Sequence, residues 1–127
     1  MIQSFFPAAS FDRASQTYSS HNFIQSFVFN RLLLFLNLNK ASSIVDIGCA
    51  TGEHTAILAD MFPDATVLGL DSSARMISAS KQRFLHSNLQ FRHANFDFIE
   101  RLDNIDLLIS NASMQWFEDC DSFFKLI

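Results

Sequence analysis

Short apolar runs and segments with helical spacing follow one another along the chain from residue 44 onward. Apolar runs bounded by turn residues are typical of buried strands, whereas apolar residues that recur every three or four positions are typical of helices. The pattern predicts strands over residues 44–48, 66–70, 89–94 and 105–110, and helices over residues 53–62 and 73–85. Strands that alternate with helices predict an α/β fold of three layers, in which helices cover both faces of a parallel sheet.

The segment before the first strand has a different pattern and is predicted to form an N-terminal helical cap, residues 1–40. Apolar residues at helical spacing predict a helix over residues 21–38 that packs on the rest of the domain. Its uninterrupted apolar run covers only residues 32–36, whereas a membrane-spanning helix needs ~20 residues. We therefore expect no membrane partner, and we expect residues 41–127 to form the α/β core.

Four predicted loops carry glycine, acid or amide residues at the carboxyl ends of the strands. Right-handed crossovers place the first strand in the middle of such a sheet, and ligands bind where the strands end. The residues in these loops are the Gly48 turn, Asp71, Asn95 and Asn111. Their convergence on one crevice predicts a ligand site there.

Within this crevice, the turn and the acid suggest a nucleoside. Gly48 and Gly52 suit a sharp turn that lets the backbone approach a ligand, although glycines also close ordinary strand-to-helix turns. Asp71 directly follows a predicted strand, as does the acid that binds ribose hydroxyls in dinucleotide sites. The alternatives for Asp71 are a solvated carboxylate and a charge at a helix N-terminus.

The spacing of the glycines argues against a dinucleotide or a nucleoside triphosphate. A G-x-G-x-x-G motif from Gly48 would need glycine at positions 50 and 53, where the chain has Ala50 and Glu53. The sequence also has no Gly-Lys-Ser or Gly-Lys-Thr of a phosphate-binding loop. We therefore expect an adenosine-containing ligand without a pyrophosphate.

Composition narrows the remaining partners and the setting. A net charge of −4 argues against binding of nucleic acid, which needs clustered Lys and Arg. Cys49 and Cys120 lack C-x-x-C spacing and no secretory leader opens the chain, which predicts a cytoplasmic protein. The four His show no ligand spacing, so no metal is expected. The fifteen Phe predict either a Phe-rich core or an interface that is left uncovered.

Two segments resemble the first two motifs of the class I S-adenosylmethionine-dependent methyltransferases, which have a Rossmann-like fold. They are residues 45–52, VDIGCATG, and residues 69–77, GLDSSARMI. Two further segments look like the malonyl-acyl-carrier-protein O-methyltransferases of biotin synthesis. They are residues 11–14, FDRA, with Tyr18 and Gln25 after them, and residues 105–116, IDLLISNASMQW.

The resemblance implies that S-adenosyl-L-methionine is the cofactor and that the turn, with Gly48, Cys49, Ala50 and Gly52, faces its methionine part. It places Asp46 near the amino group and Asp71 on the ribose hydroxyls. Around the adenine it places Ser72, Met76, Asn95 and the backbone of Phe96, although Met76 also fits a core position. Asn111 is placed on the floor near the methyl group. Tyr18 and Arg13 are candidate acceptor-site residues.

Two positions depart from the family pattern. Ala50 stands where glycine is commoner, so its side chain can crowd the cofactor. Asn95 stands where the family usually has Asp, which keeps an acceptor but loses the charge.

The resemblance also implies the reaction, which is methylation of a malonyl-acyl-carrier-protein carboxyl. A carboxylate is already nucleophilic at neutral pH, so alignment rather than a general base supplies the rate. One alternative is a methyltransferase for another small-molecule acceptor. A second alternative is a non-catalytic fragment that binds the cofactor or a partner.

The number of predicted strands differs from that of the family. The resemblance implies seven strands and four are predicted, so we expect a Rossmann-like half that is truncated after the fourth strand. Strand 105–110 would then present a bare edge, which predicts self-association.

Overall fold

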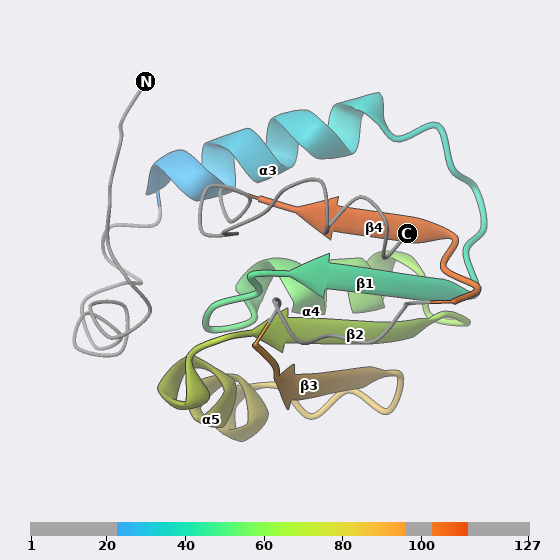
Figure 1. The fold of residues 1–127 in the computed structure, drawn as a ribbon. Coiled ribbons are helices and arrows are strands. Elements are labelled where there is room, and N and C mark those ends of the chain that lie inside the picture. The colour runs from blue at the N-terminus through green and yellow to red at the C-terminus, as the bar shows by residue number, and fades with distance from the viewer. Residues whose placement is uncertain (1–22, 96–102, 112–127) are drawn as a thin grey trace.

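The computed structural model describes residues 23–95 and 103–111. Within these residues it contains three helices and four strands (Figure 1). In chain order they are α3 Phe23–Phe35, β1 Ser43–Ile47, α4 Glu53–Met61, β2 Thr66–Asp71, α5 Ala74–Arg83, β3 Leu89–His93 and β4 Leu107–Ser110. All the elements predicted over residues 21–110 are therefore confirmed, although α3 ends at Phe35 and β4 begins only at Leu107.

The four strands form one parallel sheet in the order β3-β2-β1-β4. The interior position of β1, between β2 and β4, confirms the predicted placement of the first strand. Asp46 of β1 is in register with Gly69 of β2 and Ile109 of β4. Because all strands run the same way, their carboxyl ends lie along one edge of the sheet (Figure 1).

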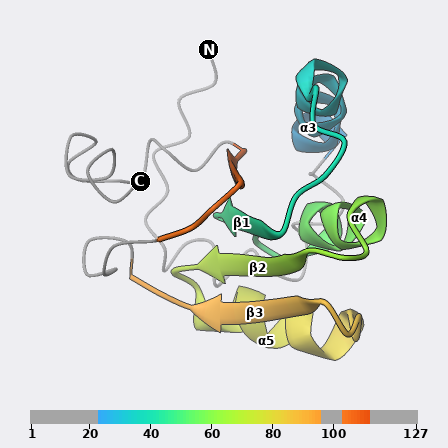
Figure 2. The ribbon, with the colours of Figure 1, turned by 90° about the vertical axis from the view of Figure 1, so that its right-hand side faces the viewer.

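Alternation along the strands separates two faces of the sheet. One face carries Ile44, Val67 and Ile109, which form a buried cluster with Phe29 of α3 and Leu58 of α4. On the same face Phe91 of β3 forms a second cluster with Ile77 of α5 and with Cys49, which follows β1. The three described helices therefore all lie over this face (Figure 2).

The opposite face carries its own apolar cluster, made of Val45, Ile47 and Leu70. These side chains are 0 to 4% exposed. Helices predicted for this face would lie outside the described residues. The α/β Rossmann-like class follows from the parallel sheet and its crossovers.

The ends of the helices follow local signals in the sequence. Ser73 is the N-cap of α5, since its hydroxyl accepts a hydrogen bond of 3.2 Å from the Met76 amide. Helix α4 ends at Met61, two residues before Pro63. The loops that follow β1 and β2 are thus short, and they hold the predicted site residues at the sheet edge.

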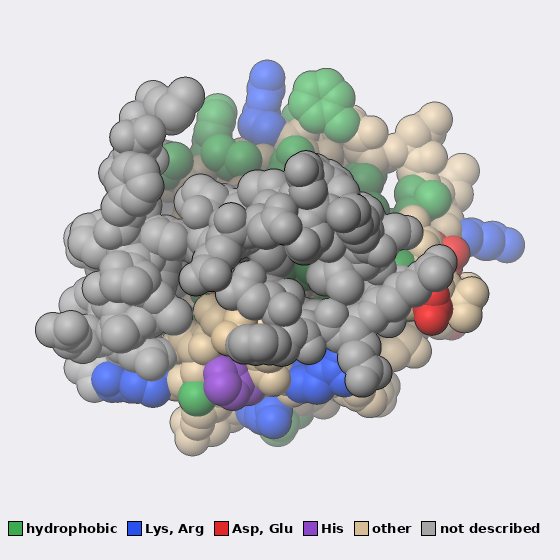
Figure 3. Space-filling model, viewed as in Figure 1, with side chains coloured by type: hydrophobic (Ala, Val, Ile, Leu, Met, Phe, Trp, Pro, Cys, Tyr) green, Lys and Arg blue, Asp and Glu red, His purple; other side chains and the backbone are tan. Residues whose placement is uncertain are grey.

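Helix α3 has apolar residues around its whole circumference. Phe29 is buried on the side of α3 that faces the sheet, whereas Phe27, Leu34 and Phe35 are exposed. Figure 3 shows hydrophobic side chains gathered along the upper edge of this view, over α3. Both interpretations of the abundant Phe thus have examples, one in the core and one at an uncovered surface.

Among the described helices, none is long and apolar enough to cross a membrane. The division of the chain at residue 40 stays a prediction.

The ring of Phe91 fills the space above two glycines. An added Cβ at Gly69 would lie 2.7 Å from Phe91 Cδ1 and 3.0 Å from Cys49 Sγ. One at Gly52 would lie 2.7 Å from Phe91 Cζ. The strand β3 can therefore pack closely under the loop after β1 only because both positions lack a side chain.

Gly69→Ala is expected to lower the free energy of unfolding by about 1–3 kcal/mol, because its methyl group overlaps the Phe91 ring. Urea unfolding measures this change. In a Phe91→Leu background the same substitution should cost clearly less, since the ring is gone. An equal cost in both backgrounds would contradict this account of the packing.

Candidate functional site

The turn after β1 has three residues in the left-handed region. The φ angles are 76° at Gly48, 50° at Ala50 and 88° at Gly52. The amides of Gly48 and Cys49 both donate to the Leu70 carbonyl, at 2.8 and 3.0 Å. The turn is thereby fixed to the end of β2. A turn at the two glycines was predicted from the sequence, but the left-handed conformation of Ala50 was not.

Asp71, at the end of β2, connects this turn to the start of α5. Its Oδ2 accepts a hydrogen bond of 2.9 Å from the Ala50 amide, and its Oδ1 accepts one of 2.8 Å from the Ser73 amide. The side chain is half-buried and holds two loops together at the predicted crevice.

Asp46 lies inside β1 and is 3% exposed. The Thr55 hydroxyl donates to its Oδ2 at 2.7 Å. Burial raises the pKa of Asp46 to about 6, the Thr55 hydrogen bond opposes this rise, and the charge of Asp71 adds to it. Since the folded pKa exceeds the ordinary value of 3.8, ionisation destabilises the fold as pH rises between the two values. A bound cation would offset this cost.

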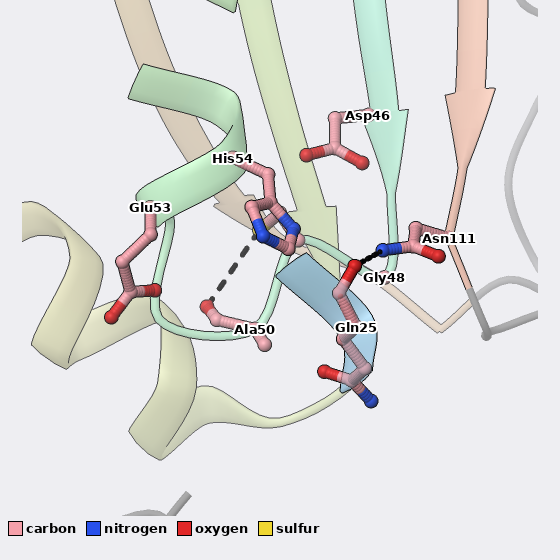
Figure 4. Close-up of a pocket in the computed structure, with 8 residues that line it drawn as sticks. Gln25, Asp46, Gly48, Ala50, Glu53, His54 and Asn111 are labelled. Carbon is pink, nitrogen blue, oxygen red and sulfur yellow. Dashed lines mark hydrogen bonds between the residues drawn. The ribbon is translucent and has the colours of Figure 1, made fainter. Parts of the chain in front are cut away.

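A pocket lies between the turn, Asp46 and Asn111. Figure 4 shows its lining, which comes from α3, β1, the turn, α4 and the residue after β4: Gln25, Asp46, Gly48, Cys49, Ala50, Glu53, His54 and Asn111. The Asn111 amide nitrogen donates to the Gln25 carbonyl at 2.9 Å. The structure thus brings together Asp46, the turn and Asn111, as predicted, and adds residues from two helices.

His54 is one of the residues that the sequence reasoning missed. Its ring stacks on Phe29 with 4.2 Å between the ring centroids, and its Nε2 lies 3.2 Å from the Ser26 hydroxyl. Burial lowers the pKa of His54 below 6.5, so the ring is neutral at pH 7. The sequence signal was the three-residue spacing of Ser26 and Phe29, which places both residues that contact His54 on one face of the predicted helix.

Glu53, also missed, is held by two neighbours. It accepts a hydrogen bond from the Thr51 hydroxyl and forms an ion pair with Arg83 of α5. Because Arg83 is more than half exposed, this pair adds little stability. Its effect is to orient the Glu53 carboxylate at the rim of the pocket.

The remaining predicted residues lie around or outside this pocket. Burial, aided by the charges of Asp46 and Asp71, raises the pKa of the Cys49 thiol, so the thiol stays protonated. Met76 is only 1% exposed, which favours its interpretation as a core residue. Asn95 is exposed just beyond β3, and the Ser72 carbonyl accepts a hydrogen bond from His93 Nε2. Three predicted residues lie outside the described ranges: Arg13, Tyr18 and Phe96.

Within residues 23–95 and 103–111, no group of three or more His, Cys, Asp or Glu side chains could hold a metal ion.

Comparison with known proteins identifies the family to which this chain belongs. Residues 38–127 match the sequence model of a family described as "Methyltransferase domain". The chain is 37% identical over 111 residues to the malonyl-[acyl-carrier protein] O-methyltransferase of Acetivibrio thermocellus, covering 86% of this chain and 39% of that protein. It is 50% identical over 78 residues to the trans-aconitate 2-methyltransferase of Deinococcus radiodurans, covering 61% of this chain and 29% of that protein. The chain therefore spans less than half of these relatives' length.

A solved structure agrees with the fold. The putative S-adenosylmethionine-dependent methyltransferase from Methanococcus maripaludis superposes with a TM-score of 0.70 at 20% identity, covering 99% of this chain and 60% of that chain. At this identity the likeness concerns the fold alone. Together with the family match over residues 38–127, it confirms the prediction from the sequence motifs. The chain belongs to the class I S-adenosylmethionine-dependent methyltransferases.

Proposed function

We propose that this chain binds S-adenosylmethionine at the turn of residues 48–52 and forms the cofactor-binding part of an enzyme that methylates a carboxylate. One observation carries the proposal. The left-handed turn, the buried carboxylate of Asp46 and the carboxylate of Asp71 all gather at the carboxyl edge of the sheet.

The residues fit the methionine part of this cofactor. Asp46 is an acid in a buried position, where its own ionisation is costly. An ammonium group beside it would favour the ionised form and recover this cost. Of the two glycines with a left-handed φ, Gly52 makes room for Phe91, so we propose that the ligand approaches the backbone at Gly48.

The nucleoside part would extend along the edge toward β3. Asp71 would accept hydrogen bonds from the ribose hydroxyls. We propose Ser72 and Met76 beside the adenine, and Asn95 with the Phe96 backbone at its edge. Met76 would have to become more accessible than its present burial allows.

The methyl acceptor would be an anion whose own carboxylate is the nucleophile. When bound, the cofactor supplies a methyl group activated by a sulfonium. A carboxylate acceptor is ionised at pH 7, so the chain needs no general base and acts by alignment and exclusion of water. Asn111 and the neutral His54 line the pocket together with the carboxylates of Asp46 and Glu53, so such an anion would need a cation from the acceptor side. Tyr18 and Arg13 remain candidates for the acceptor side.

The names of the relatives support two acceptors. The relative covering 86% of this chain is named for malonyl-[acyl-carrier protein], and we propose this carboxyl, on the route to biotin, as the substrate. The relative with 50% identity over 78 residues is named for trans-aconitate, which is also a carboxylate and is the second candidate. A cytoplasmic location and self-association through the edge of β4 belong to the same proposal.

Asp71→Ala is expected to weaken binding of S-adenosylhomocysteine by about 10- to 100-fold, the effect of about 1.5–3 kcal/mol for a lost charged hydrogen bond. Isothermal titration calorimetry measures the affinity. Asp64→Ala, which removes an exposed carboxylate before β2, is the matched control and should change nothing. Unchanged affinity in a folded Asp71→Ala variant would place the ribose elsewhere.

The affinity for S-adenosylhomocysteine should be constant above pH about 6 and fall below it, by at most about tenfold per pH unit, because protonated Asp46 no longer attracts the ammonium group. Calorimetry from pH 5 to 8 measures this profile. Asp46→Asn should flatten it, and adenosine, which lacks the α-ammonium group of the methionine part, should show no such fall. A profile that is flat in the unaltered chain would remove Asp46 from the proposed role.

Incubation with S-adenosylmethionine and a malonyl thioester is expected to release S-adenosylhomocysteine and a methyl ester, both detectable by mass spectrometry. The amide analogue, whose carboxylate is replaced by a carboxamide, should give no product. Product from trans-aconitate alone would favour the second candidate. Binding of the cofactor without turnover of either acid would favour a cofactor-binding fragment.

A further inference from the structure

Ala50 has an unfavourable backbone conformation at the centre of the turn. Its φ of 50° brings the Cβ of an L-residue too close to the following carbonyl oxygen, whereas glycine has no such penalty. Such a conformation persists only where the surrounding structure holds it. The contacts that hold Ala50 are therefore part of the construction of the site.

Two side chains from other elements hold the backbone of Ala50 at both its polar atoms. Asp71 Oδ2 accepts from its amide at 2.9 Å. The Ser80 hydroxyl donates to its carbonyl oxygen, 2.9 Å away and 30 residues along the chain. The thiol of Cys49 lies 3.8 Å from the same carbonyl and is a weak donor. Ser80 is thus the strong side-chain donor to the Ala50 carbonyl in the described part of the chain.

The position of Ser80 on α5 requires a small residue with a hydroxyl. Ser80 is fully buried, and a Cβ added at Gly52 would lie 3.2 Å from Ser80 Cβ, so the helix packs directly on the turn. The same hydroxyl also lies 2.8 Å from the Met76 carbonyl, a contact common for serine within helices, so its single proton is shared between the two carbonyls. That contact alone gives no reason for a hydroxyl here, since it slightly destabilises helices. The hydrogen bond to the Ala50 carbonyl in the turn gives a reason for the hydroxyl.

We propose that Ser80 is a positioning residue of the cofactor site, which holds Ala50 in its left-handed conformation so that the turn keeps the shape that binds S-adenosylmethionine. The expected effect on cofactor binding rests on the proposed function, whereas the effect of Ser80 on the conformation of Ala50 does not. Glycine at position 50 would adopt this conformation without help. The dependence on Ser80 therefore follows from the alanine of this chain.

The test combines Ser80→Ala with Ala50→Gly. Ser80→Ala alone is expected to weaken binding of S-adenosylhomocysteine about three- to tenfold, the range for one neutral hydrogen bond. In the double variant the affinity should return to within about twofold of that of Ala50→Gly alone, because residue 50 no longer needs the hold. Ser78→Ala, an exposed serine on the same helix, is the matched control and should leave binding unchanged.

Amide hydrogen exchange in the ligand-free chain separates this inference from the proposed function. Ser80→Ala should speed exchange at the amides of Ala50 and Gly52, which are hydrogen-bonded in the intact turn, and Ala50→Gly should reduce this effect. If exchange is accelerated in this way but the unaltered chain binds no cofactor, the proposed function is wrong, whereas the stabilisation of Ala50 by Ser80 is confirmed. Unchanged exchange, or an equal loss of affinity with and without Ala50→Gly, would overturn the role of Ser80.

Discussion

The reversal of the chain after β1 is the constraint on which the rest of the structure depends. Three left-handed residues bring the backbone from the end of β1 over the end of β2 and into α4. Phe91 and Ser80 can approach this turn closely because Gly52 has no side chain. The core beneath the turn and the site above it are therefore parts of one packing arrangement, and a change at either side is felt at the other.

Two carboxylates give this edge of the sheet its chemical character. Asp46 is buried under the turn, and Asp71 holds the turn from β2. Burial raises the pKa of Asp46 and of the Cys49 thiol, and the negative charges of the neighbouring carboxylates add to the rise. An edge of this kind suits a ligand with positive charge and hydroxyl donors better than it suits a phosphate. S-adenosylmethionine has both features.

The sequence predicted the parts of the fold that depend on local pattern. Buried strands and helix spacing located β1, β2 and α5, because these patterns depend on residues close together in the chain. The same holds for the glycine turn. The left-handed Ala50 was not predictable in this way, since its conformation depends on Asp71 and Ser80. His54 and Gln25 were also missed, because their contacts join α3 to α4 and to Asn111 across the fold.

We propose above all that the edge formed by the turn, Asp46 and Asp71 binds S-adenosylmethionine. Titration of the ¹⁵N-labelled chain with S-adenosylhomocysteine, followed by amide chemical shifts, tests it most directly. We expect the largest shifts in residues 48–52 and 71–73 and at Asn111. Shifts confined to the amino ends of the strands, or no shifts at millimolar ligand, would contradict it.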